Sequence, residues 1–192
     1  MSITKDQVIV ALDIAAKLEA LGFSVVIAGG FARDVYFQEP PKDLDIVIGV
    51  GSLKAGEEME AVKQALALLE VTAQGFHMYN ESTDDRIVGG FKCVGNVDVV
   101  LYRVKEATAA VDCFDFNLNQ FVLLGDGSFE GSYVAYAGDS PWHELTPVRS
   151  DYSQERSNKM REKWLNLSWR YPENDGPARV KLSDGVFHDP DL

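Results

Sequence analysis

The sequence predicts a mixed α/β fold, an α+β arrangement in which helices cover one face of a mixed sheet. Long segments with apolar residues at helical spacing alternate with short β-branched runs early in the chain, and the short runs cluster later. Of the 192 residues, 46% are hydrophobic, which is enough for a buried core. No repeat or low-complexity tract interrupts this pattern. We therefore expect one principal domain with a short appendage.

Apolar spacing and the positions of Gly and Pro place the individual elements. Helices are expected at 5–21, 31–37, 57–69, 104–111 and 153–169. Strands are expected at 23–28, 44–50, 71–79, 87–94, 96–102 and 121–124. Residues 131–147 are rich in Gly, Pro and aromatics and predict an irregular connection, and the tail after Pro172 is expected to be loosely ordered. The head domain is thus assigned to 1–148, and a C-terminal helix with an irregular tail to 149–192.

The charge is acidic overall but unevenly distributed. The net charge is −12, with 10 Lys/Arg against 22 Asp/Glu in residues 1–148 and 8 of each in residues 149–192. This excludes the broad basic face with which proteins wrap a long nucleic acid. It does not exclude a nucleotide, because bound Mg²⁺ would invert the local charge. Without a membrane-length apolar segment or a secretory signal, we expect a cytoplasmic protein with no membrane partner.

A pair of carboxylates, Asp43 and Asp45, opens the strand expected at 44–50. Residues two apart on a strand share one face, so these two side chains should lie next to each other. Mg²⁺ prefers such oxygen ligands and keeps positions for water and phosphate. Taken alone, the pair is also typical of a solvated strand end.

Gly29-Gly30 ends a strand and opens a helix, with Arg33 one turn further on. Such a turn presents backbone N–H groups to an anion, and an arginine there can hold a phosphate with two donors. The alternative is a simple tight turn with Arg33 paired to Asp34 at the surface.

Asp98 lies inside the otherwise apolar strand at 96–102. A buried charge is costly unless it is paired or bound to a metal, although Asp98 would also fit on a solvent-exposed face with Val97 and Val99 inward. With Asp43 and Asp45 it would complete a three-carboxylate site for two metal ions about 3.5–4 Å apart.

These motifs together carry a family resemblance. Gly29-Gly-Phe-Ala-Arg-Asp34, with Asp43-x-Asp45 nine residues later, resembles the G-G-x-V-R-D…D-x-D signature of the tRNA nucleotidyltransferase (CCA-adding) and bacterial poly(A) polymerase family. That family belongs to the DNA polymerase beta-like nucleotidyltransferase superfamily. Val97–Arg103 resembles its third-carboxylate strand, and Asp115-Phe-Asn-Leu-Asn119 its D-F-T-x-N motif. The resemblance covers about residues 23–125 and implies that Asn119 contacts the nucleotide.

The departures from the family pattern limit what the resemblance implies. Phe114 stands where the family has an arginine, Asn117 replaces its threonine, and no E-D-x-x-R motif for choosing C and A occurs. Specific C-C-A addition is therefore not expected.

The resemblance implies a Mg²⁺-dependent nucleotidyltransferase, with Mn²⁺ as an alternative ion, that moves a nucleoside monophosphate from a triphosphate to an acceptor hydroxyl. Asp43, Asp45 and Asp98 would be catalytic metal ligands, and Gly29, Gly30 and Arg33 would hold phosphates. An RNA 3′ end is the leading acceptor. Nucleotidylation of a small molecule or protein, and a non-catalytic regulatory domain, are the alternatives, and the sequence specifies neither the base nor the oligomeric state.

Overall fold

The computed structural model describes residues 2–77, 86–172 and 176–189, and it confirms the mixed α/β class. Its main sheet has five strands in the order β1-β2-β5-β4-β3. They are β1 (Ser24–Ile27), β2 (Leu44–Gly49), β3 (Ala73–Phe76), β4 (Ile87–Cys93) and β5 (Val97–Tyr102). β2 and β5 pair in parallel and the other neighbours pair antiparallel, so the sheet is mixed as expected. Residues 78–79 of the expected third strand lie outside the described residues.

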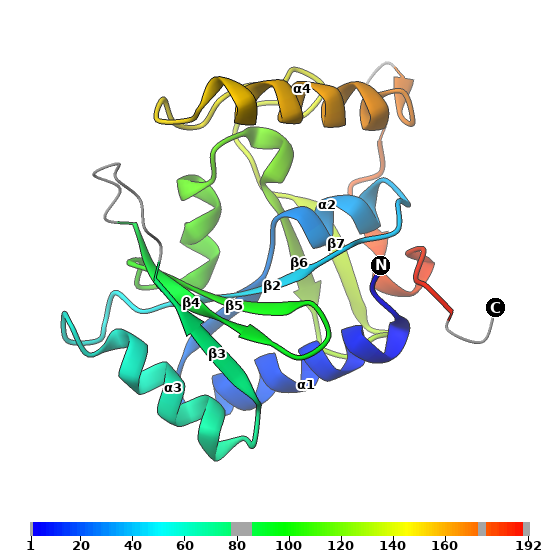
Figure 1. Ribbon diagram of the computed structural model, residues 1–192. Coiled ribbons are helices and arrows are strands. Elements are labelled where there is room, and N and C mark those ends of the chain that lie inside the picture. The colour runs from blue at the N-terminus through cyan, green and yellow to red at the C-terminus, as the bar shows by residue number, and fades with distance from the viewer. Residues whose placement is uncertain (1, 78–85, 173–175, 190–192) are drawn as a thin grey trace.

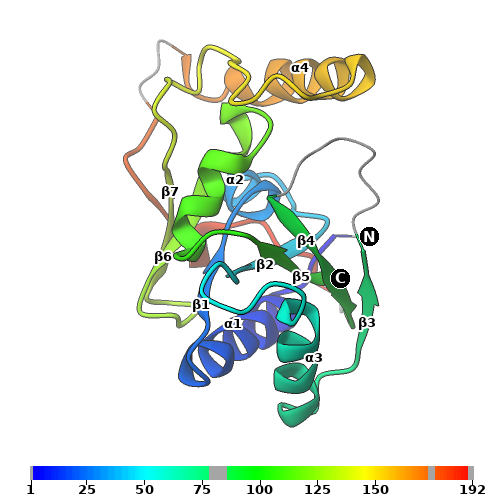
Figure 2. The same cartoon turned by 90° about the vertical axis from the view of Figure 1, so that its left-hand side faces the viewer.

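Two helices, α1 (Lys5–Ala20) and α3 (Glu58–Leu68), lie together on one face of this sheet (Figures 1 and 2). α1 begins with a capping box in which the Thr4 and Gln7 side chains each bond the other's backbone amide. Alternate residues of the two central strands are buried in the main core: Leu44, Ile46, Ile48, Val97, Val99 and Leu101. Because strand side chains alternate, the intervening residues point to the opposite face.

The opposite face is covered only in part. A second apolar cluster there includes Val47, Tyr102 and residues of the 3₁₀ helix η1 (Ala107–Cys113), which replaces the short helix expected at 104–111. A shorter 3₁₀ turn, η2, spans Asn117–Asn119.

A second sheet, β6-β7-β8, corrects two expectations. It contains β6 (Phe121–Gly125), β7 (Ser132–Tyr136) and β8 (Val180–Lys181), so residues 131–147 are not wholly irregular and the tail is not loosely ordered over 176–189. The tail also contains a 3₁₀ turn, η4 (Leu182–Asp184), which buries Leu182. The Gly and Pro residues around β7 predicted an irregular segment. In the structure β7 is a strand because it pairs with β6 on one side and with β8 on the other. The two sheets meet where the Gly29 amide donates to the Phe121 carbonyl at 2.9 Å.

α4 (Gln154–Ser168) crosses above the partly covered face, and the short α2 (Gly30–Tyr36) lies between it and the main sheet (Figure 1). Met160 and Leu167 of α4 are buried, and its N-terminus is capped by the Ser153 hydroxyl. Within the described residues, no helix is both long and apolar enough to cross a membrane.

Candidate active site

The three predicted carboxylates gather at one end of the two parallel strands. Asp45 on β2 and Asp98 on β5 occupy paired positions, and Asp43 lies directly before β2. Their side chains point to the face of the sheet opposite the buried side chains of Leu44, Ile46, Val97 and Val99. The strand period and the parallel register therefore place the carboxylates on the face that α4 crosses.

This grouping concentrates negative charge. Burial, followed by the neighbouring Asp43 and Asp98 carboxylates, raises the pKa of Asp45 from 3.8 to about 7. Lys92, which faces Asp98 from β4, offsets part of this charge through a 2.7 Å contact between Nζ and Asp98 Oδ2. Lys92 is largely exposed, so the compensation is weak.

The donor set suits a hard divalent cation. No three His, Cys, Asp or Glu side chains in the described part of the chain form a ready-made metal site. Mg²⁺ does not need one, because it is commonly held by one or two carboxylates together with substrate phosphates. Asp43 and Asp45 are the residues that would hold it, with Asp98 beside them.

The backbone of the Gly29-Gly30 turn lies close to the carboxylates Asp43 and Asp45, and it lines the same cavity. Gly29 has φ 88°, a left-handed conformation that favours glycine, and it caps α2. A Cβ on Gly30 would lie 3.4 Å from Arg33 Nη2, so Gly30 leaves room for the guanidinium above it.

Arg33 is buried and bonded to protein side chains rather than lying at the surface. Its Nε and Nη2 contact Asp34 Oδ1 at 2.8 and 2.7 Å, and Nη1 donates to Asn119 Oδ1 at 2.6 Å. The structure thus joins two of the predicted nucleotide contacts, Arg33 and Asn119, to each other. Of the five guanidinium N–H groups, these contacts leave two for a ligand.

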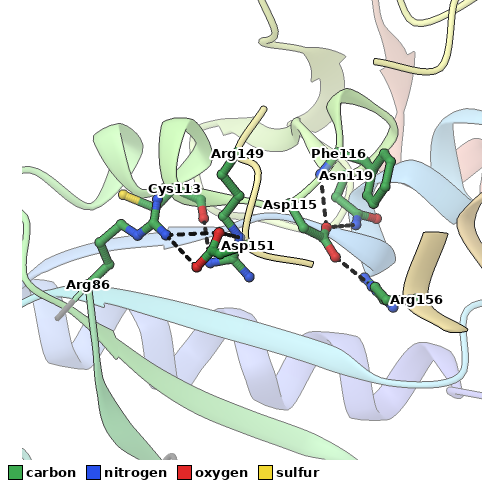
Figure 3. Close-up of polar contacts among 8 residues, drawn as sticks. All are labelled: Arg86, Cys113, Asp115, Phe116, Asn119, Arg149, Asp151 and Arg156. Atoms are coloured by element: carbon green, nitrogen blue, oxygen red, sulfur yellow. Dashed lines mark hydrogen bonds and ion pairs between the residues drawn. The ribbon is translucent and has the colours of Figure 1, made fainter. Parts of the chain in front are cut away.

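Asn119, which accepts the Arg33 hydrogen bond, also contacts a further carboxylate, Asp115. Figure 3 shows Asp115 with its partners Phe116, Asn119 and Arg156. Asp115 accepts hydrogen bonds from Asn119 Nδ2 at 2.9 Å, from the Phe116 amide at 2.9 Å and from Arg156 Nε of α4 at 2.5 Å. Burial alone would raise the pKa of Asp115, but the bonds from Arg156 and Asn119 outweigh it and hold that pKa below its ordinary value.

These groups surround one open cavity of about 500 Å³. Asp43 and Asp45 line it at the sheet, and Gly29, Gly30, Arg33 and Asn119 at α2 and η2. Its apolar wall contains Val47, Val100, Tyr102 and Phe114, with the Phe114 and Tyr102 rings edge to face at 5.9 Å. Asp98 lies beside the cavity rather than in its lining.

Sequence reasoning missed the contribution of α4. Arg156, Lys159, Met160 and Lys163 all line the cavity, whereas the sequence predicted a helix at 153–169 without assigning any of its residues to the site. The spacing of the three cations, at i, i+3 and i+7, was the available signal, because it places them on one helical face. The cavity thus draws on both predicted parts of the chain, 1–148 and 149–192.

Comparison with known proteins gives matches among solved structures alone. No protein-family profile matches the chain, and neither does any curated protein sequence. The CCA-adding enzyme of Bacillus stearothermophilus in complex with CTP matches 79% of this chain and 36% of its own length, at 16% identity and a TM-score of 0.45. The apo form I of a CCA-adding enzyme matches 59% of this chain and 26% of its own, at 16% identity and a TM-score of 0.39. The lincosamide antibiotic adenylyltransferase LnuA, lincomycin-bound, matches 88% and 99%, at 15% identity and a TM-score of 0.38. The chain thus spans about a quarter to a third of the two CCA-adding enzymes.

Proposed function

We propose that this protein transfers a nucleoside monophosphate from a nucleoside triphosphate to an acceptor hydroxyl group and releases pyrophosphate. The observation that carries the proposal is the charge arrangement of the cavity. The Asp43 and Asp45 carboxylates line one side of it. The rest of the lining includes Asp34 and Asp115, each paired with an arginine, and six cations: Arg33, Lys42, Arg149, Arg156, Lys159 and Lys163.

A triphosphate with a divalent cation complements both sides. At the sheet, burial and then the neighbouring Asp43 and Asp98 carboxylates raise the pKa of Asp45, so a cation there would stabilise its charged form. At α4, burial and then the neighbouring Arg33 guanidinium lower the pKa of Lys163, so a nearby anion would stabilise its charged form. In a chain whose net charge is −12, such a cluster of cations favours a polyanionic ligand.

Mg²⁺ is the proposed cofactor, with Mn²⁺ as an alternative. Held by Asp43 and Asp45, it would neutralise phosphate oxygens and template the in-line displacement. We propose two such ions. Asp43 and Asp45 would hold both, and Asp98 would be a further ligand of one of them.

The chain's own residues position the reactants. As the acceptor oxygen bonds to the α-phosphorus, the bond from that phosphorus to the oxygen bridging to the β-phosphorus breaks, and the acceptor proton passes to Asp98. Phe114, which lines the cavity, offers the base or sugar an aromatic face. Positioning and charge neutralisation account for this chemistry without a protein nucleophile.

The proposed acceptor is an RNA 3′ end. The test is incubation with each α-labelled nucleoside triphosphate and Mg²⁺, in parallel with total RNA and with a cell lysate depleted of RNA, using Asp45→Asn as the control. Label on RNA that disappears with the variant supports the proposal. Label on a small molecule or a protein would support nucleotidyl transfer but show that the acceptor is not RNA. No incorporation in any arm would indicate a non-catalytic domain.

A further inference from the structure

Simple packing on the head accounts for only part of α4, whose Met160 and Leu167 are buried. A helix that only covers a core turns its apolar residues inward and its charges outward. In α4, Arg156, Lys159 and Lys163 line the cavity, whereas Leu165 is 58% exposed and Trp169, at the end of the helix, is 65% exposed. Like charges that line one cavity favour a ligand of opposite charge.

The three cations are not equally engaged within the protein. Arg156 is committed to Asp115. Lys163 Nζ lies 3.7 Å from Asp34 Oδ1, an oxygen that already accepts two closer contacts from Arg33. In the described residues, Lys159 has no hydrogen-bond or ion-pair partner. Two lysines of one helical face are therefore available to a ligand.

The helix that carries them is held firmly in place. Trp164 Nε1 donates to the Trp142 carbonyl at 3.1 Å. Just beyond the helix, Arg170 pairs with Glu39, and the Tyr171 hydroxyl donates to the Tyr36 carbonyl at 3.0 Å. A fixed helix keeps its charges in position before a ligand arrives, which lowers the entropic cost of binding.

We propose that α4 binds the triphosphate tail of the nucleotide through Lys159 and Lys163, while Arg33 chiefly positions Asp34 and Asn119. This inference rests on the proposed function. Lys163 lines the same cavity as Arg33, Lys42 and Asp43 and lies within electrostatic reach of all three. A phosphate chain held there would therefore begin beside the carboxylates that hold the cation, which favours the triphosphate over the backbone phosphates of an acceptor strand.

The test measures binding without catalysis. Isothermal titration calorimetry in EDTA with sodium tripolyphosphate, ATP and adenosine compares the wild-type protein with Lys159→Met and Lys163→Met, since methionine keeps most of the aliphatic stem. Arg161→Met is the matched control, because Arg161 is an exposed cation of the same helix that does not line the cavity. Circular dichroism verifies that each variant is folded.

We expect each lysine variant to weaken tripolyphosphate and ATP binding by about tenfold, as loss of one charge-assisted contact predicts. Adenosine binding should be unchanged in all variants, and Arg161→Met should bind like the wild type. Equal weakening by Arg161→Met, or wild-type affinity in both lysine variants, would overturn the inference. So would a loss of affinity for a short single-stranded RNA in the lysine variants with tripolyphosphate binding intact.

The two proposals fail in different ways. If the expected binding pattern is found but no nucleotide is incorporated into any acceptor, α4 binds phosphate and the proposed nucleotidyl transfer is wrong. If transfer occurs and the lysine variants bind tripolyphosphate like the wild type, the proposed transfer is supported and the proposed phosphate binding by α4 is wrong.

Discussion

The two sides of the cavity are built in different ways. The carboxylate side comes from β2 and β5, where Asp45 and Asp98 are paired by the register of adjacent parallel strands. The cationic side comes from α4, which reaches the cavity because Trp164 and the residues after it dock against distant segments. The register of two paired strands thus positions the carboxylates, and side-chain contacts between distant segments position the cations of α4. Substitutions on the first side should therefore affect chemistry most strongly, and those on the second side should affect ligand binding.

The largest expected effect is on the carboxylate side. Asp43→Ala or Asp45→Ala should reduce nucleotide transfer by on the order of 10³-fold or more, because several kcal/mol of charge stabilisation in the transition state would be lost. Steady-state rates at saturating Mg²⁺ measure it. Asp13→Asn, which changes an exposed residue of α1 paired with Lys17, is the control. A variant of Asp43 or Asp45 with near wild-type transfer would show that the assignment is wrong.

Arg33→Ala should affect stability and binding together. Removing one member of a buried ion pair costs about 3–5 kcal/mol, since Asp34 is left without its closest partner. Arg33 also holds Asn119 in the cavity wall and has two further N–H groups, so its loss should raise KM for the triphosphate by roughly 10- to 150-fold.

Urea denaturation and kinetics on Arg33→Ala and on Arg33→Ala/Asp34→Ala separate the two effects. We expect the double variant to regain stability while its KM remains high. A single variant as stable as the wild type would contradict the role of the buried pair.

Charge crowding at Asp45 predicts a pH-dependent stability. Between its ordinary pKa of 3.8 and its folded value of about 7, the folded state retains a proton that the unfolded state has lost. The stability of the metal-free protein should therefore fall as the pH rises through this window.

Asp45→Asn removes this penalty. In EDTA at pH 8 its Tm should exceed that of the wild type by several degrees, since about 1 kcal/mol shifts Tm by about 2–4 °C at this chain length. The difference should shrink toward pH 5, and Mg²⁺ at pH 8 should stabilise the wild type more than the variant. A variant less stable than the wild type at pH 8 would contradict the prediction.

Selection among bases should be a smaller effect. Because the Phe114 and Tyr102 rings line the cavity, it should discriminate by shape and stacking, on the order of 10- to 200-fold between triphosphates. Phe114→Ala should reduce that ratio by about tenfold, as measured by kcat/KM for each triphosphate. An unchanged ratio would place the base elsewhere.

The same reasoning predicts that the chain does not build C-C-A accurately. A tRNA lacking its 3′ end, supplied with CTP and ATP and sequenced after reaction, tests this. Accurate and terminating C-C-A addition would show that the cavity contains a template for base choice without the E-D-x-x-R motif.

The main sheet and the carboxylate positions were accessible from sequence because they depend on local periodicity. Asp43 and Asp45 share a face through the two-residue period of a strand, and the strand around Asp98 was equally plain. Gly29 was recognisable for a similar reason, since its positive φ is a local requirement that glycine meets.

Tertiary structure decided the remainder. Arg33 bonds Asn119 across 86 residues of sequence, and β7 is a strand because β6 and β8 pair with it. The cations of α4 line the cavity because of where the helix docks, as Trp164 on the Trp142 carbonyl illustrates. Local periodicity is written into a few consecutive residues. The free energy of docking comes instead from contacts between segments far apart in the chain, whose side chains carry no local mark of the partner they will meet.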